Sequence, residues 1–168
     1  DLFYVYNPEF YRAISLEALA RFEEGHVVHD HMDTDFLEYE GTYSMAELMM
    51  GLSGDYWVTF DLSSGWNSTG LKTTHMYLIV AEAEIQAGHY DEAMKALDAI
   101  RVNRINPDVY APLEGTVTTE ADAIAHLKQT SHGENIYSCY NFINRKRWNQ
   151  LDGYKETLTR DIAGTVYT

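Results

Sequence analysis

Apolar and polar residues alternate at helical spacing through the middle of the chain. Between residues 73 and 87, apolar side chains recur every three or four positions, which predicts a helix with one buried stripe. The members of this stripe are Met76, Ile79, Val80, Ala83 and Ala87. The same spacing returns after residue 90, at Ala93, Leu97, Ile100 and Arg104. The pattern therefore predicts two antiparallel helices over residues 75–87 and 90–104, with Gly88 between them at positive φ.

Residues at the ends of these two helices fit a helical hairpin. Thr73 or Thr74 can accept a hydrogen bond from the free N–H groups of the first turn. Asp91 and Glu92 suit the positive end of the second helix dipole. Five small residues would let the helices approach closely: Ala81, Ala83, Ala87, Ala93 and Ala96. Residues 73–105 thus predict a tetratricopeptide-like hairpin, a unit of about 34 residues. Because one hairpin cannot bury both of its faces, we expect further chain to cover it.

The region before the hairpin combines helical and extended patterns. Asn7 and Pro8 open a helix that ends at Gly25. Its apolar stripe consists of Phe10, Ile14, Ala18 and Phe22. Ser44 with Glu47 forms a capping box for a short helix that reaches Leu52. The remaining elements are a loop over 26–35, a half-exposed strand over 56–62 and a polar loop over 63–70.

The region after the hairpin is helical again, with irregular segments at both ends. Residues 106–115 contain two prolines and must be irregular. Thr119 with Asp122 starts a helix that breaks at residues 131–133, and a second helix covers 134–148. The first helix holds Ile124 and Leu127, and one side of the second holds Ile136, Cys139, Tyr140, Phe142 and Ile143. Residues 153–168 are weakly patterned and extended. We therefore expect a mainly α-helical fold with long irregular loops.

Composition excludes some classes of partner, and it adds little to the prediction of the fold. The chain has 168 residues, the length of a single domain, and a formal net charge of −14. Nucleic acids and anionic membrane surfaces both need positive charge, so we expect neither as a partner. Cys139 is the only cysteine, which excludes an internal disulfide, and its apolar surroundings predict a small core residue.

A cluster of histidines and acids is the strongest candidate for a metal site. His26, His29 and His31 lie among Asp30, Asp33 and Asp35, and these side chains are ligands that zinc accepts. However, the spacing matches neither H-x-H-x-D-H nor H-E-x-x-H, and no glycine or closing glutamate completes a calcium loop. We therefore interpret the segment as a solvated acidic loop and expect no metal.

The sequence contains no pattern that indicates catalysis. The serines at positions 53, 63 and 64 belong to turns and do not form a G-x-S-x-G elbow. No carboxylate stands isolated in apolar surroundings, where its pKa would rise. Phosphate-binding glycine motifs are also missing from the sequence. We therefore expect a binding protein without a cofactor, and no enzyme.

The hairpin carries a resemblance to a known family. Tyr77–Glu84 (YLIVAEAE), Gly88–Ala93 (GHYDEA) and Leu97–Arg101 (LDAIR) look like the Y-L-I-R-A-E-A, G-N-Y-D-E-A and L-N-A-I-R block of the SusD/RagB family. Arg147–Leu151 (RWNQL) is similar to the family's R-W-x-D-L segment, with Gln150 where aspartate is usual. The two matches keep the family's order and separation, and together they cover roughly the last 95 residues.

The resemblance implies a location, partners and a superhelical fold. Family members are lipid-anchored proteins of the outer-membrane surface in Bacteroidetes, with an α-α superhelix of tetratricopeptide-like units. They take part in polysaccharide utilisation and nutrient uptake, capturing oligosaccharides and passing them to a TonB-dependent, SusC-like transporter. They are longer than this chain, which contains no lipid-modified N-terminal cysteine. The resemblance therefore implies that residues 1–168 are the C-terminal portion of a longer protein, whose other repeats cover the hairpin.

Aromatic residues before the hairpin are the candidate ligand contacts. A sugar ring stacks its apolar face on aromatic rings, while its hydroxyls pair with polar side chains. Tyr56 with Trp57, and Trp66 with Asn67, offer such pairs on a strand and on a loop. Packing inside the protein would account for either tryptophan as well. Trp148 lies in the R-W segment, where we expect a packed scaffold residue.

Two hypotheses about function follow. In the first, the chain binds a neutral or cationic glycan, since a surface at −14 repels polyanions. In the second, it is a tetratricopeptide adaptor that binds a peptide or protein partner in a helical groove on the concave face of residues 76–104. Removing Trp66 should abolish glycan binding in the first case and leave partner binding unchanged in the second.

Overall fold

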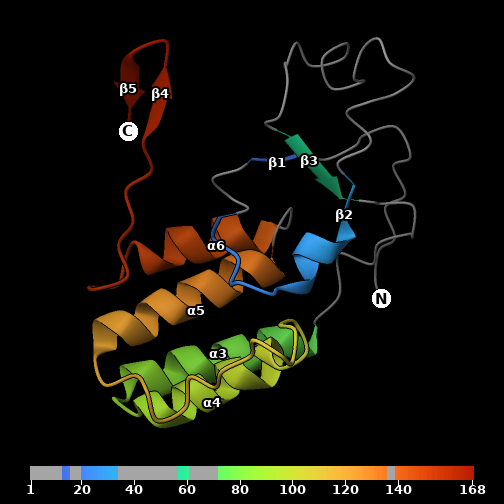
Figure 1. Cartoon of the computed structure of the whole chain (residues 1–168). Coiled ribbons are helices and arrows are strands. Elements are labelled where there is room, and N and C mark those ends of the chain that lie inside the picture. Colours follow the sequence, from blue (N-terminus) through green and yellow to red (C-terminus); the bar gives the residue numbers. More distant parts are fainter. Residues whose placement is uncertain (1–12, 16–19, 34–56, 61–71, 136–138) are drawn as a thin grey trace.

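The computed structural model describes residues 13–15, 20–33, 57–60, 72–135 and 139–168 (Figure 1). In this part the chain is mainly helical, as the sequence predicts, with four α-helices and short strands. The helices are α3 (Thr73–Gln86), α4 (Tyr90–Arg101), α5 (Glu120–Glu134) and α6 (Cys139–Trp148). A 3₁₀ helix, η1, spans Val27–His31, and the strands are β1 (Ala13–Ser15), β2 (Met32–Asp33), β3 (Trp57–Phe60), β4 (Arg160–Ile162) and β5 (Thr165–Tyr167).

Helices α3 and α4 form the predicted hairpin around Gly88. The glycine has a φ of 79°, as predicted. The backbone N–H of His89 donates to the carbonyl of Glu84 at 2.9 Å, and that of Gly88 donates to Ile85 at 3.0 Å. These two hydrogen bonds make a Schellman motif, which satisfies carbonyls left free at the end of α3. The turn therefore follows from one residue that adopts positive φ without strain.

The start of α3 differs from the prediction. Neither Thr73 nor Thr74 caps the helix, because Lys72 is the N-cap residue and its side chain makes no capping hydrogen bond. Instead, Nδ1 of His75 accepts from the backbone N–H of Lys72 at 3.4 Å. The acidic start of α4 is as predicted, with Asp91 and Glu92 in its first turn.

The predicted buried stripe of α3 is wrong. Met76, Ile79 and Val80 are 57%, 62% and 47% exposed, and Ala83 and Ala87 are exposed as well. The helix buries the opposite face instead, which consists of His75, Leu78, Ala81, Glu82 and Ile85. Both faces of α3 are largely apolar, so periodicity alone did not separate them. The polar members of the buried face find hydrogen-bond partners on α5 and α6, which makes their burial possible.

The core lies between α3, α4 and α5, and α6 closes one side of it (Figure 1). Its apolar members are Leu78, Ala81, Ile85, Ala93, Met94, Ala96, Leu97, Ile100, Val117, Ala123, Ile124, Leu127, Trp148 and Tyr154. The predicted buried positions of α4, Ala93, Leu97 and Ile100, are confirmed. Of the five alanines predicted to allow close helix approach, Ala81, Ala93 and Ala96 are buried.

Helix α5 begins where predicted and continues past the predicted break. Thr119 is its N-cap residue, and the Thr119 hydroxyl accepts from the backbone N–H of Asp122 at 3.2 Å. The helix then runs through residues 131–133 to Glu134, so the predicted break is wrong. Gly133 lies against Phe22, because a Cβ at this glycine would be 3.0 Å from the Phe22 ring. The glycine therefore permits a close tertiary contact inside a helix and does not end it.

Helix α6 turns a different side inward than predicted. Phe142 and Ile143 are 64% and 50% exposed, and Cys139 is exposed, so its prediction as a core residue is wrong. The inner side of α6 makes polar contacts. Asn141 Nδ2 donates to the carbonyl of Asn135 at 2.9 Å, which fixes α6 against the end of α5. Trp148 is buried, as predicted. The predicted start of this helix at residue 134 is also wrong, and residues 136–138 lie outside the described part.

The strands form two small antiparallel sheets. In the order β1–β3–β2, Ile14 of β1 pairs with Val58 of β3, so this part of the predicted helix from Asn7 to Gly25 is wrong. β3 confirms the predicted strand over residues 57–60. η1 and β2 replace part of the predicted loop over 26–35. The predicted helix from Ser44 to Leu52 and the loop over 63–70 lie outside the described residues.

The C-terminal region confirms the extended prediction. β4 and β5 pair with each other, and the hairpin stands away from the helices in Figure 1. Its turn contains Ala163 and Gly164, both at positive φ.

Candidate functional site

The residues predicted to bind a sugar lie at the edge of the described structure. Trp57 is the first residue of β3, and its backbone pairs with Ser15 of β1. Tyr56, Trp66 and Asn67 lie outside the described residues, so the structure does not test whether the four candidates lie together. Their role remains a prediction from the sequence. The described residues instead show two clusters of ion pairs and hydrogen bonds, which we call joints. They fix the positions of the helices that would support a binding region.

The first joint links α3 to α6. Glu82 of α3 accepts hydrogen bonds from both terminal nitrogens of Arg147, with 2.6 Å between Nη2 and Oε2. The indole Nε1 of Trp148 donates to the same carboxylate oxygen at 3.0 Å. We call Glu82, Arg147, Trp148 and Tyr154 the α3–α6 joint. Its carboxylate is nearly buried, and such a charge is tolerated only when it is paired and hydrogen-bonded.

Two aromatic rings pack beside this ion pair, in which Glu82 is nearly buried and Arg147 is 47% exposed. The Tyr154 ring packs 6.2 Å from the Trp148 ring, and the Arg147 guanidinium lies 5.8 Å from the centroid of the same indole. The hydrogen bond to Glu82 raises the pKa of Arg147. Burial, together with the charges of Glu82 and Glu120, raises the pKa of Tyr154 to about 12. Arg147 and Tyr154 therefore keep their charge states near neutral pH, which suits a scaffold role.

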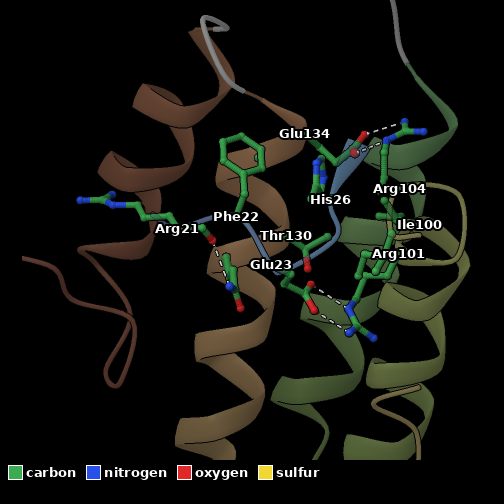
Figure 2. Close-up of a pocket in the computed structure, with 12 residues that line it drawn as sticks. Arg21, Phe22, Glu23, His26, Ile100, Arg101, Arg104, Thr130 and Glu134 are labelled. Carbon is green, nitrogen blue, oxygen red and sulfur yellow. Dashed lines mark hydrogen bonds and ion pairs between the residues drawn. The ribbon is translucent and has the colours of Figure 1, made fainter. Parts of the chain in front are cut away.

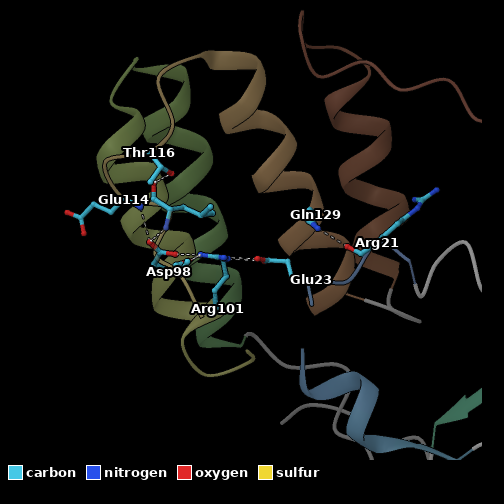
Figure 3. Close-up of polar contacts among 9 residues, drawn as sticks. Arg21, Glu23, Asp98, Arg101, Glu114, Thr116 and Gln129 are labelled. Atoms are coloured by element: carbon cyan, nitrogen blue, oxygen red, sulfur yellow. Dashed lines mark hydrogen bonds and ion pairs between the residues drawn. The ribbon is translucent and has the colours of Figure 1, made fainter. Parts of the chain in front are cut away.

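The second joint links α4 to the segment before η1. Figure 3 shows Arg101 of α4 between Asp98 on one side and Glu23 on the other. Arg101 donates to both oxygens of Glu23, at 2.8 Å and 2.6 Å, and to an oxygen of Asp98. The second oxygen of Asp98 accepts from the backbone N–H groups of Leu113 and Glu114, at 2.7 Å and 3.0 Å. We call Glu23, Asp98 and Arg101 the α4 joint, and it ties three parts of the chain together.

A pocket beside the α4 joint has too little room for a ligand. Figure 2 shows its charged walls, in which Arg101 faces Glu23 and Arg104 faces Glu134. The Arg104 guanidinium donates to both oxygens of Glu134, at 2.6 Å and 3.1 Å. The cavity has a volume of about 20 Å³, which holds about one water molecule. These charges therefore satisfy one another, and the pocket is a structural contact.

The histidine segment lies against the end of α4. The backbone N–H of Val27 donates to the carbonyl of Arg104 at 2.7 Å, which places His26 beside this helix end. Nδ1 of His26 accepts from the N–H of Val28 at 3.1 Å, and its ring lies 4.8 Å from the Phe22 ring. Burial lowers the pKa of His26. The imidazole is thus a packed, neutral group.

Within the described ranges, no three His, Cys, Asp or Glu side chains gather closely enough to hold a metal ion. Asp35 lies outside these ranges, and the prediction that the segment binds no metal stays a prediction.

A wide depression lies over the hairpin turn, with a volume of about 630 Å³. Its lining includes Asp91 and Glu92 from the start of α4 and one aromatic residue, Tyr90. Tyr90 is half-buried and packs against the core, so it does not present a free stacking face. The most exposed phenyl ring in the described chain is that of Phe142, and Nζ of Lys146 lies 5.0 Å from its centroid. The sequence pattern had placed this ring on a buried side.

Comparison with known proteins adds no family or function. No protein-family model matches the chain. No curated protein and no solved structure matches it either. In the described part of the chain, no helix is both long and apolar enough to cross a membrane.

Proposed function

We propose that this chain is part of a SusD-like protein that binds glycans at the outer-membrane surface. Such a protein captures oligosaccharides and passes them to a TonB-dependent transporter. The observation that supports this proposal best is the α3–α6 joint. Glu82 belongs to the first segment that resembles the family, and Arg147 and Trp148 belong to the second. The two segments are 65 positions apart at Glu82 and Arg147, and they bond directly.

The α4 joint supports the same proposal. Asp98 and Arg101 come from the L-D-A-I-R end of the first resembling segment, and both bond to distant parts of the chain. In this proposal, the residues that carry the resemblance are scaffold residues. A scaffold of this kind leaves ligand contacts to other segments, and the aromatic residues between 56 and 67 remain our candidates.

Binding would use stacking and neutral hydrogen bonds. Trp57 and Trp66 offer flat apolar surfaces to the C–H faces of sugar rings, while Tyr56 and Asn67 offer hydrogen bonds to hydroxyls. No bond in the glycan is made or broken, so the function needs neither a catalytic residue nor a cofactor. Membrane attachment, in this proposal, uses a lipid anchor.

The basic residues of α6 are largely paired with acids of the protein, so they do not favour an anionic glycan over a neutral or cationic one. Arg147 is paired with Glu82, and Arg145 lies 3.4 Å from a carboxylate oxygen of Glu156. Lys146 lies over the Phe142 ring. Two of the three cations in this cluster therefore neutralise acids of the protein. The net charge of −14 then repels polyanionic glycans.

Retention on a panel of insoluble polysaccharides tests the proposal. We expect wild-type protein to be retained on at least one neutral polysaccharide, and Trp66→Ala and Trp57→Ala to lose retention while staying folded. Phe142→Ala is the matched control, because it removes an exposed aromatic ring from α6 and should leave retention unchanged. Equal retention of all four proteins would contradict the site. No retention on any neutral polysaccharide would contradict the function, and the adaptor hypothesis would then take its place.

Salt dependence tests the charge argument separately. Stacking and neutral hydrogen bonds are screened little, so the affinity for a neutral oligosaccharide should be similar at low and high ionic strength. Titration calorimetry with a neutral and a uronate-rich oligosaccharide provides the comparison. Tight binding of the acidic oligosaccharide that weakens with salt would show that the choice of ligand is wrong.

A further inference from the structure

Basic side chains of α5 and α6 converge on one side of the described structure. Lys128 and His132 are four positions apart, so they lie on the same side of α5. Asn141 of α6 donates to the carbonyl of His132 at 3.2 Å, which places Arg145, one turn further along α6, next to this side of α5. The two helices therefore contribute to one cationic surface, although the net charge of the protein is −14.

A third part of the chain adds another cation to this surface. Gln129 of α5 donates to the carbonyl of Arg21 at 2.9 Å, which fixes Arg21 beside this helix. The Arg21 side chain points away from Glu23 and toward the side of α6 (Figures 2 and 3). We call Arg21, Lys128, His132 and Arg145 the cationic cluster.

The imidazole of His132 lies in the field of the other three cations. Burial lowers the pKa of His132, and Glu156 acts against this shift. Arg145, Arg21 and Lys128 add to the lowering. His132 is therefore neutral at pH 7, and it would gain a proton if a negative charge came close to it.

Acids near the cationic cluster are paired elsewhere or are held at a longer distance. Glu23 and Glu134 each pair with a different arginine outside the cluster. Glu156 lies 3.4 Å from Nη2 of Arg145, which is longer than an ordinary hydrogen bond between charged groups. The Nε–H of the same arginine is buried and makes no hydrogen bond within the described part of the chain. Because a buried N–H without an acceptor costs free energy, this nitrogen favours an additional oxygen.

We propose that the cationic cluster binds a small, doubly charged oxyanion, either phosphate or sulfate. Arg145 offers Nε–H and Nη–H groups in one plane, a geometry that matches two oxygens of such an anion. Lys128 and Arg21 supply further positive charge, and His132 donates a hydrogen bond once it is protonated. A singly charged carboxylate would offset less of this charge. The bound anion competes with Glu156 for the guanidinium group of Arg145.

Anion binding at this cluster goes beyond the proposed glycan binding and is compatible with it. A small anion meets the local field of the cluster, since salt screens charges beyond about 8 Å at physiological ionic strength. A long polyanionic glycan extends past this range and meets the net charge of −14. The cluster therefore selects a small anion and does not reverse the preference for a neutral or cationic glycan.

Thermal unfolding of the full chain in phosphate or sulfate tests the proposal, with sodium chloride at equal ionic strength as the reference. For a dissociation constant of about 1 mM, Tm should rise by about 4 °C in 10 mM anion. Arg145→Gln and Lys128→Gln should each lose most of this rise. Lys146→Gln is the matched control, because it removes a positive charge from an exposed position of α6 and should keep the rise. An equal rise in all four proteins would indicate a general salt effect and would overturn the proposal, as would no rise in wild type.

A substitution of opposite sign separates anion binding from a change in the fold. Glu156→Gln removes the competing carboxylate, so calorimetry should show phosphate binding about threefold more tightly than to wild type. Weaker binding by this variant would contradict the placement of the anion beside Arg145.

Nuclear magnetic resonance of the imidazoles gives a readout that does not depend on stability. Saturating phosphate should raise the pKa of His132, because the anion stabilises the protonated ring. The spectrum of His132→Gln identifies the resonance of this residue. The pKa of His89, which is exposed and pairs with Glu84 at the far end of α3, should stay unchanged. Equal titration of His132 with and without phosphate would overturn the proposal.

Discussion

Helices α3 and α4 are halves of one hairpin, yet they expose different types of residue to solvent. The exposed side of α4 carries Asp91, Glu92 and Lys95. The exposed side of α3 carries apolar and uncharged residues such as Met76 and Ile79. Both helices bury apolar residues toward each other, so the difference is confined to their outer sides.

This difference shows why the packing of one helix was easier to predict than that of the other. On α4, the spacing of the apolar residues identifies the buried side, and Asp98 and Arg101 are buried there as well because they bond to each other and to Glu23. On α3, both sides are apolar, and the inner side is defined by where its polar residues find partners. His75 and Glu82 are buried because Asn135 and the α3–α6 joint receive them.

Removing a large side chain from the inner side of α4 should have the largest effect. Leu97 is fully buried, so Leu97→Ala should destabilise the protein by about 2–5 kcal/mol through lost contacts and a cavity. Ile79 lies on the outer side of α3, and Ile79→Ala should change stability by less than about 0.5 kcal/mol at dilute protein concentration. Chemical denaturation measures both. Equal losses would mean that the outer side of α3 packs within the same chain.

Sequence predicted the elements whose signals are local. Gly88, the acidic start of α4 and the Thr119 cap depend on residues within one or two turns, and all three are confirmed. The buried face of α4 was also predictable from the spacing of Ala93, Leu97 and Ile100, although the burial of Asp98 and Arg101 on it was not predicted. Trp148 was predicted to be packed, and it is.

Elements that depend on distant partners could not be predicted in this way. Burial of Glu82 requires Arg147, which lies 65 positions later, and burial of His75 requires Asn135, which lies 60 positions later. Gly133 was interpreted as a helix breaker because its contact with Phe22 has no local signal. The same limit applies to both polar joints, of which only the Trp148 packing was predicted.

A substitution at the turn between the helices should have an intermediate effect. Gly88 has positive φ, and an added Cβ would meet nothing within 4 Å. The cost of Gly88→Val is therefore confined to the backbone and should be about 1–3 kcal/mol. Gly88→Asn should cost less, because asparagine tolerates this conformation. Thermal or urea unfolding measures the difference, and equal stability of the valine variant would contradict the hairpin turn.

Acidification should lower the free energy of unfolding through two imidazoles, His26 at the end of α4 and His132 beside α6. Burial lowers the pKa of both His26 and His132 below 6.5. As the pH falls below about 6.5, the unfolded chain binds protons at these imidazoles and the folded chain does not, so the folded state loses stability. The loss should stop once the pH is below the folded pKa values. Urea unfolding across this range should show the decline, and His26→Gln with His132→Gln should flatten it. A stability that rises on acidification would contradict the burial of both imidazoles.

A double-mutant cycle across the α3–α6 joint tests the account's central claim most directly. The claim is that the two segments of the family resemblance meet through Glu82 and Arg147, whose side chains are 10% and 47% exposed. Urea unfolding of wild type, Glu82→Gln, Arg147→Met and the double variant gives their coupling energy. We expect a coupling of about 1 kcal/mol, because the two charges share two hydrogen bonds and the Glu82 carboxylate is nearly buried, while the exposure of Arg147 limits the gain. A coupling indistinguishable from zero would mean that the two residues do not interact, and the scaffold that supports the proposed function would be contradicted.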